Sequence, residues 1–189
     1  MTQHTPIDTT LSSILSGYQE SFSKKVHEKD SSKTDLLMDV FGITPAMKAE
    51  NSQYWGRELG MCWQRLVVSL CSAHAKDFGP ALKWESNEPC DLTVGKLAID
   101  TKYRIGSGDS GTLKKWVSYG EYLTAQGYTP TLLIFRTDNL DSAIKACIRG
   151  GWKIYTGEAT LKQIHKLTNV ELGEYLKRNN GKHSIGRKR

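Results

Sequence analysis

Apolar residues recur with helical spacing from Trp55 to about Ala75. Seven of them lie at positions i, i+3, i+4, i+7, i+8, i+11 and i+12. This spacing forms one continuous stripe and predicts a helix that buries one face. They are Leu59, Cys62, Trp63, Leu66, Val67, Leu70 and Cys71. Glu58 lies off the centre of this stripe, and Gly79 and Pro80 are expected to close the helix.

The hydrophobic period then changes to that of strands. Three short segments of alternating character are separated by turn-forming residues, a pattern that predicts a three-stranded antiparallel meander. They are ALKWES (81–86), CDLTVG (90–95) and KLAIDTKYRI (96–105). In the third segment the odd-numbered side chains resemble a core face, whereas the other face carries Asp100 and Lys102.

The rest of the chain predicts alternating helices and strands. A helix is expected over TLKKWVSYGEYLTAQ, a buried strand over TLLIFR, a helix over 140–149, a strand over WKIYT, and one or two helices over 158–177. This order predicts an α/β fold with a three-layer core, in which a central mixed β-sheet is flanked by helices.

The chain length of 189 residues suits one domain with extensions. We expect residues 1–54 to form an N-terminal helical arm, with a short helix over DLLMDVFG before Pro45. Residues 55–177 are the expected core, and residues 178–189 a basic C-terminal tail.

The net charge of +6 comes from the end of the chain. Six basic residues and no acidic one lie between Lys177 and Arg189, whereas the residues before them hold 20 basic and 20 acidic side chains. This basic segment could bind phosphates or could equally be a solvated end. No apolar run approaches the length of a membrane span, and no signal peptide or CxxC spacing is present, so a cytoplasmic setting without membrane partners is expected.

Three side chains form the candidate site. A tight turn near Gly95 would place Asp91 across from Asp100, and Lys102 points to the same side as Asp100. Two carboxylates that close repel each other unless a proton or a cation lies between them, and hard oxygen ligands suit Mg²⁺ or Mn²⁺. The alternative is a surface ladder of solvated charges. Glu58 likewise has an alternative role, as an exposed partner of Arg57 or Arg65.

These motifs resemble the PD-(D/E)XK nuclease superfamily over about residues 55–156. The resemblance is carried by the helix WGRELG with Glu58, by EPCD with Asp91, and by IDTK with Asp100 and Lys102. Cys90 between Pro89 and Asp91 departs from the family pattern without removing a ligand. Within the superfamily, DTKYRIGSGDSGTLKKW followed by GGWKIYTGEA is similar to type II restriction endonucleases of the ApaLI-like group.

The resemblance implies a Mg²⁺-dependent endonuclease that cleaves double-stranded DNA at a specific sequence, with Mn²⁺ as a substitute ion and no organic cofactor. Asp91, Asp100 and Glu58 would be metal ligands, and Lys102 the catalytic lysine. Cleavage of a palindrome implies a homodimer, with the helical arm as a candidate interface. A structure-specific or repair nuclease on the same fold, such as a junction resolvase, and a non-catalytic nucleic-acid-binding protein are the alternatives.

Four basic residues are candidates for DNA binding. Lys114 and Lys115 are expected in the first turn of the helix after the loop GSGDSG, and Arg104 would extend the line from Lys102 toward them. An ordinary flexible loop is the alternative. Arg136 follows the buried strand and could read base edges, although a plain turn is the alternative there.

Overall fold

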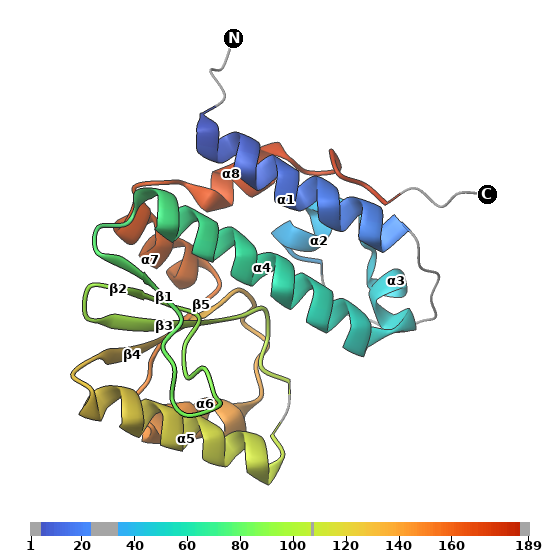
Figure 1. Cartoon of the computed structure of the whole chain (residues 1–189). Coiled ribbons are helices and arrows are strands. Elements are labelled where there is room, and N and C mark those ends of the chain that lie inside the picture. Colours follow the sequence, from blue (N-terminus) through green and yellow to red (C-terminus); the bar gives the residue numbers. More distant parts are fainter. Residues whose placement is uncertain (1–4, 24–33, 107, 186–189) are drawn as a thin grey trace. The chain divides into compact units, whose positions relative to one another are not determined.

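The computed structural model describes residues 5–23, 34–106 and 108–185 (Figure 1). The described residues form two compact units, one before Leu70 together with the residues from Glu171 on, and the other from Leu70 to Val170. The boundary therefore falls within a helix, between Ser69 and Leu70, and differs from the expected boundaries at residues 54 and 177. We call the two parts the helical unit and the sheet unit.

In the described residues the helical unit contains two long helices, α1 (Pro6–Ser23) and most of α4 (Ser52–His74), and three short ones. The short helices are α2 (Leu36–Phe41), α3 (Pro45–Glu50) and α8 (Leu172–Arg178). Asp35 caps α2 by accepting the backbone N–H groups of Leu37 and Met38. Gly42 ends the same helix in a left-handed conformation, with φ of 62°, which glycine adopts without strain.

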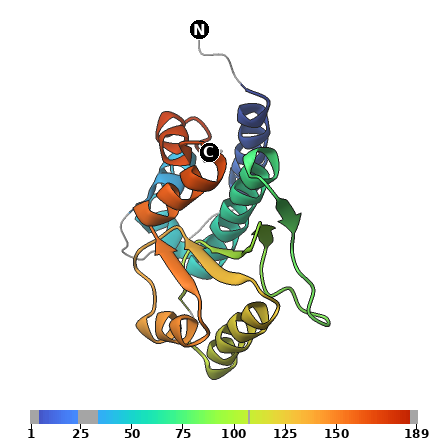
Figure 2. The same ribbon diagram turned by 90° about the vertical axis from the view of Figure 1, so that its left-hand side faces the viewer.

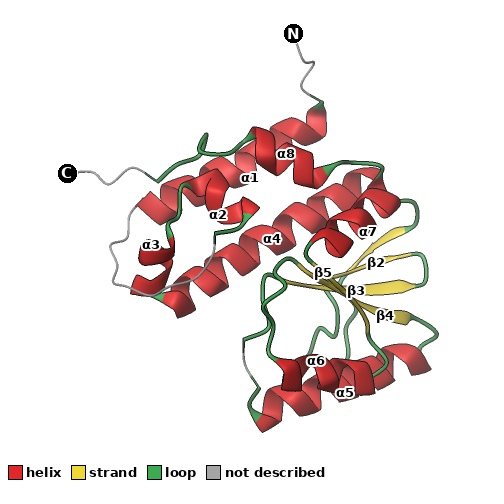
Figure 3. Cartoon of the chain, turned by 180° about the vertical axis from the view of Figure 1, so that it is seen from behind, coloured by secondary structure: helices red, strands yellow, loops and turns green. Residues whose placement is uncertain are grey.

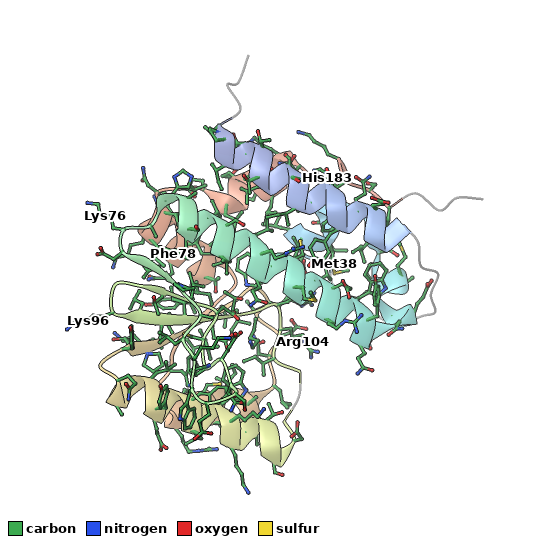
Figure 4. All side chains as sticks on the ribbon, in the orientation of Figure 1. Met38, Lys76, Phe78, Lys96, Arg104 and His183 are labelled. Carbon is green, nitrogen blue, oxygen red and sulfur yellow. The ribbon has the colours of Figure 1, made fainter. Side chains whose placement is uncertain are left out.

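The two ends of the chain pack together within the helical unit. Ser12 of α1 shares a hydrogen bond of 3.0 Å with the Tyr175 hydroxyl of α8. The backbone N–H groups of Gly181 and Ile185 donate to the carbonyls of Asp39 and Phe41. His183, labelled in Figure 4, is buried. In the segment expected to be a basic tail, residues 181–185 are thus held to α2 by backbone hydrogen bonds, while the side chains of Arg178 and Lys182 are exposed. Residues 186–189 lie outside the described part.

The predicted amphipathic helix is present as α4, and all seven residues of its apolar stripe are buried. The helix begins three residues earlier than expected, because the Asn51 side chain accepts the backbone N–H of Tyr54 at its start. The helix stops at His74, close to the predicted end at about Ala75. Gly79 and Pro80 do not close it, as was expected; they belong to a strand at the edge of a sheet, where proline is tolerated.

The sheet unit is a mixed sheet with helices on both faces. Its elements are β1 (Phe78–Pro80), β2 (Leu92–Val94), β3 (Leu97–Lys102), α5 (Ser110–Ala125), β4 (Thr129–Ile134), α6 (Asp141–Arg149), β5 (Lys153–Thr156) and α7 (Glu158–Thr168). The strand order is β1-β2-β3-β4-β5, antiparallel from β1 to β3 and parallel from β3 to β5. Helices α5 and α6 cover one face and α7 lies on the other (Figures 1, 2 and 3). The predicted α/β fold with a central mixed sheet is confirmed.

The first strand of the meander is not the one expected. β1 is formed by Phe78–Pro80, whereas ALKWES is a loop. Its alternating pattern has another cause: Leu82 packs on the core beneath α5, and the Trp84 ring stacks on Tyr122 with centroids 4.4 Å apart. The pattern thus reflects packing on a helix instead of on a sheet.

The centre of the sheet is buried on both faces. Ala98, Ile99, Asp100 and Thr101 of β3 are all buried, because the strand lies between β2 and β4 with helices above and below. The face that the sequence suggested to be polar packs under α5 and α6, beside a core that includes Ala98, Trp116, Leu132, Ile134, Ala146 and Trp152. Asp100 is therefore enclosed.

Candidate active site

The structure brings Asp91, Asp100 and Lys102 together. Leu92 of β2 pairs with Ile99 of β3, so Asp91 reaches the region beside Asp100 at the start of β2. The Asp91 carboxyl group lies near enough to that of Asp100 to raise its pKa. The Lys102 ammonium lies 2.5 Å from Asp100 Oδ1. The side chains of Asp91, Asp100 and Lys102 therefore lie together where the start of β2 meets β3.

The site is buried at Asp100 and open at Lys102. The Asp100 side chain is 10% exposed, whereas that of Lys102 is 37% exposed. Burial raises the pKa of Asp100 to about 7, against the attraction of Lys102, and the neighbouring Asp91 raises it further. Burial would lower the pKa of Lys102, but the carboxylates of Asp100 and Asp91 outweigh that effect and raise it. The amine is therefore charged at neutral pH.

The walls around Asp100 are apolar. The Lys102 ammonium lies over the Trp116 ring, 5.6 Å from its centroid. Cys90 and Cys147 are both buried, and burial raises the pKa of their thiols to about 11 and about 12. These thiols are neutral at neutral pH, so they add no negative charge beside Asp100.

The donor set suits Mg²⁺ or Mn²⁺. Asp100 lies beside a second carboxyl group and has a raised pKa, so a cation bound here would take the place of the Asp100 proton. Mg²⁺ in proteins keeps several waters and needs only one or two carboxylates, the rest of its shell coming from phosphate oxygens. Within residues 5–23, 34–106 and 108–185, no group of three or more His, Cys, Asp and Glu side chains is arranged to hold a metal ion, so a cage made wholly of protein ligands is not formed there.

Glu58 belongs to the helical unit. Its side chain is 15% exposed, and its carboxylate accepts two hydrogen bonds from the Arg57 guanidinium, at 2.8 and 3.0 Å. This is the ion pair that the sequence offered as the alternative. Its role as a third metal ligand stays a prediction.

Arg104 and Arg136 converge on one acid. The Arg136 guanidinium is 8% exposed and donates to Asp138 Oδ1 at 2.6 Å. Arg104, labelled in Figure 4, donates to the Asp138 carbonyl at 2.7 Å and is 47% exposed. Asn139 closes the turn by accepting the backbone N–H of Ile105. Arg136 is thus held within a structural turn, whereas Arg104 keeps an exposed side.

The two lysines of α5 do not lie where the sequence placed them. The helix begins at Ser110, so Lys114 and Lys115 follow the first turn and are exposed. Asp109 caps the helix: its carboxylate accepts the backbone N–H of Thr112 at 2.9 Å and the Thr112 hydroxyl at 2.6 Å. An acid therefore occupies the helix start that was expected to bind phosphate.

The sequence reasoning missed Thr101. Its backbone N–H and its hydroxyl both donate to Asp91 Oδ2, at 2.7 and 2.6 Å. The strand period assigned Thr101 to the core face, and nothing in the spacing pointed to a contact with an acid ten residues away. The contact between Thr101 and Asp91 follows only from how β2 and β3 pair in the folded sheet.

No protein-family model, curated protein or solved structure matches this chain. The likeness to PD-(D/E)XK nucleases therefore stays a prediction from the quoted motifs. Among the helices of the described residues, none combines the length and the apolar character needed to cross a membrane.

Asp100 is expected to make the metal-free protein less stable as the pH rises. Its folded pKa of about 7 lies above the ordinary value of 3.8, so the folded state binds the proton more tightly and the free energy of unfolding falls between about pH 4 and pH 7. Asp100→Asn should remove this slope and stabilise the protein at pH 8 by on the order of 2 kcal/mol. Urea denaturation in EDTA at pH 5 and pH 8 measures both effects.

The matched control is Asp141→Asn, because the Asp141 side chain is 91% exposed. This control should leave the pH dependence of unfolding unchanged. An Asp100→Asn protein with the same dependence as the wild type would contradict the raised pKa.

Proposed function

We propose that this protein is a Mg²⁺-dependent DNA endonuclease, with Mn²⁺ able to replace Mg²⁺. The observation that carries the proposal is the meeting of Asp91, Asp100 and Lys102 at one partly enclosed place on β2 and β3. Hydrolysis of a phosphodiester needs a cation against the phosphate charge and a donor that orients the attacking water. In this proposal Asp91 and Asp100 bind the cation, and Lys102 is the donor.

Each side chain has a distinct task in this proposal. A bound Mg²⁺ would polarise the scissile phosphate and lower the pKa of a bound water. Asp91 and Asp100 hold the cation, and the Asp100 proton has to leave when the cation binds. Lys102 donates hydrogen bonds to the attacking water or to the phosphate oxygens from the open side of the site. In-line attack leaves a 5′-phosphate and a 3′-hydroxyl, as the resemblance implies.

The choice of DNA as substrate is supported by basic residues near Lys102. Arg104 follows Lys102 by two residues beyond the end of β3, and it is half exposed. Lys114 and Lys115 lie exposed on α5, the helix that packs over the sheet beside Lys102, and their contact with DNA is a prediction from the sequence. These cations are suited to phosphates on either side of a scissile bond. Arg136 would act through Asp138 by holding Arg104 in place.

The narrower assignment is a type II restriction endonuclease, and it depends on the quoted resemblance. An enzyme that cuts both strands of a palindrome needs two sites related by a twofold axis. We therefore propose a homodimer, with residues 1–54 as a candidate interface.

The test is digestion of plasmid and phage DNA by the full chain, with Mg²⁺ and with EDTA. Discrete fragments that require Mg²⁺ are expected for a sequence-specific endonuclease. Cleavage confined to branched DNA would replace the restriction assignment with a structure-specific nuclease. Salt-sensitive DNA binding with no cleavage of any substrate would overturn the enzyme proposal and leave a binding protein.

A further inference from the structure

Thr101 lies between Asp100 and Lys102 in β3, yet its polar groups contact the neighbouring strand. Its hydroxyl donates to Asp91 Oδ2 at 2.6 Å, and its backbone N–H donates to the same oxygen at 2.7 Å. Thr101 is only 4% exposed. Two donors from one buried residue thus fix the same oxygen of Asp91, and water has little access to replace the hydroxyl.

The strand ladder by itself does not fix the Asp91 side chain. Asp91 donates its backbone N–H to the Ile99 carbonyl at 2.9 Å, although Leu92 is the residue paired with Ile99. Asp91 precedes β2, so its backbone bond lies just outside the regular ladder of the strand. The alternation of the strand therefore does not set the direction of the Asp91 carboxylate, which depends on the groups that bind it.

We propose that Thr101 is a positioning residue that aims the Asp91 carboxylate at the cation shared with Asp100. By holding Oδ2, Thr101 fixes the plane of the carboxylate and sets the direction in which its other oxygen points. Carboxylate ligands of metals are commonly oriented in this way by hydrogen bonds from residues that do not touch the ion. The inference rests on the proposed function, because it assigns Thr101 a role toward the same metal.

Thr101 could instead serve only as a buried β-branched residue of the sheet. Substitutions that separate shape from hydroxyl distinguish the two roles. Thr101→Val keeps the branched shape and removes the hydroxyl donor, whereas Thr101→Ser keeps the donor and removes the methyl group. The control is Thr131→Val in the adjacent strand β4: Thr131 is 1% exposed, and its hydroxyl donates to the Thr129 carbonyl and not to an acid.

The experiment is calorimetric titration of Mn²⁺ into the metal-free full chain, without DNA. We expect Thr101→Val to weaken Mn²⁺ binding by about 10- to 100-fold. Thr101→Ser and Thr131→Val should each stay within about threefold of the wild type. The Mg²⁺ concentration for half-maximal cleavage should rise for Thr101→Val and recover in Thr101→Ser.

The outcomes separate the two proposals. If the wild type binds no Mn²⁺, the proposed function fails and the role of Thr101 fails with it. If the wild type binds Mn²⁺ and Thr101→Val binds it equally well, only the positioning role is overturned. Should Thr101→Val not fold, Thr101→Ala beside Thr101→Ser compares absence and presence of the hydroxyl without the methyl group, and equal Mn²⁺ affinities in that pair would also overturn the role.

Discussion

Replacing Lys102 with methionine is expected to lower the rate of Mg²⁺-dependent DNA cleavage by about a thousandfold or more. The ammonium is the cationic group of the three-residue site, and it lies at the exposed side where a phosphate would enter. Methionine keeps an unbranched apolar stem, one atom shorter than that of lysine, and removes the charge above the Trp116 ring. The measurement is single-turnover cleavage of a plasmid by the variant and the wild type, with binding to DNA measured separately in Ca²⁺.

DNA affinity in Ca²⁺ should change by less than about threefold, because loss of a single phosphate contact has a small effect on total binding. The matched control is Lys96→Met, at the exposed turn between β2 and β3 (Figure 4). This variant should cleave at the wild-type rate. Cleavage by Lys102→Met within tenfold of the wild type would remove Lys102 from the mechanism.

Replacing Gly120 with valine is expected to unfold the sheet unit or to destabilise it by at least about 4 kcal/mol. Helices α5 and α6 meet where Gly120 approaches Gly150, and a Cβ at Gly120 would lie 1.9 Å from the Gly150 carbonyl oxygen. That oxygen belongs to backbone and cannot rotate away. The Trp152 indole N–H also donates to the Trp116 carbonyl at 2.7 Å, which ties the start of β5 to α5 near the same place.

Urea denaturation monitored by tryptophan fluorescence measures this loss. The control is Gly56→Ala in α4, where a Cβ meets nothing within 4 Å. Alanine there should be neutral or should stabilise by up to about 1 kcal/mol, because glycine is a poor helix former. A Gly120→Val protein as stable as the wild type would show that the α5–α6 contact is looser than the structure has it.

Helix α5 links the two predictions. It carries Gly120 on the side toward α6 and Trp116 beneath the Lys102 ammonium. A change that separates the helices would also withdraw one wall of the candidate site. A milder substitution, Gly120→Ala, should therefore reduce cleavage as well as stability.

The elements with a clear local period were predicted from the sequence. The buried stripe of α4 and the continuous apolar run of β4 both form as expected, because each pattern depends on residues within one element. The elements without such a period were missed. β1 is a three-residue edge strand, too short to show alternation, whereas ALKWES alternates because its side chains pack on α5.

The same distinction holds for the candidate site, where some features could be predicted from the sequence and others could not. The spacing of Asp100 and Lys102 places them on one side of a strand, and the turn at Gly95 brings Asp91 beside them; both follow from local geometry and could be predicted. The sequence also determined that the charge of the chain up to Leu176 is balanced.

Only the tertiary structure decided what surrounds these residues. The packing of α5 and α6 buries Asp100 and raises its pKa, Asp138 binds Arg104 and Arg136, and Thr101 holds the Asp91 carboxylate. Burial and side-chain pairing depend on segments that are distant along the chain, so the local pattern of apolar and polar residues does not predict them. The sequence by itself therefore determined which groups are the candidates for the chemistry, whereas the fold decided how strongly each is desolvated and which partner it binds.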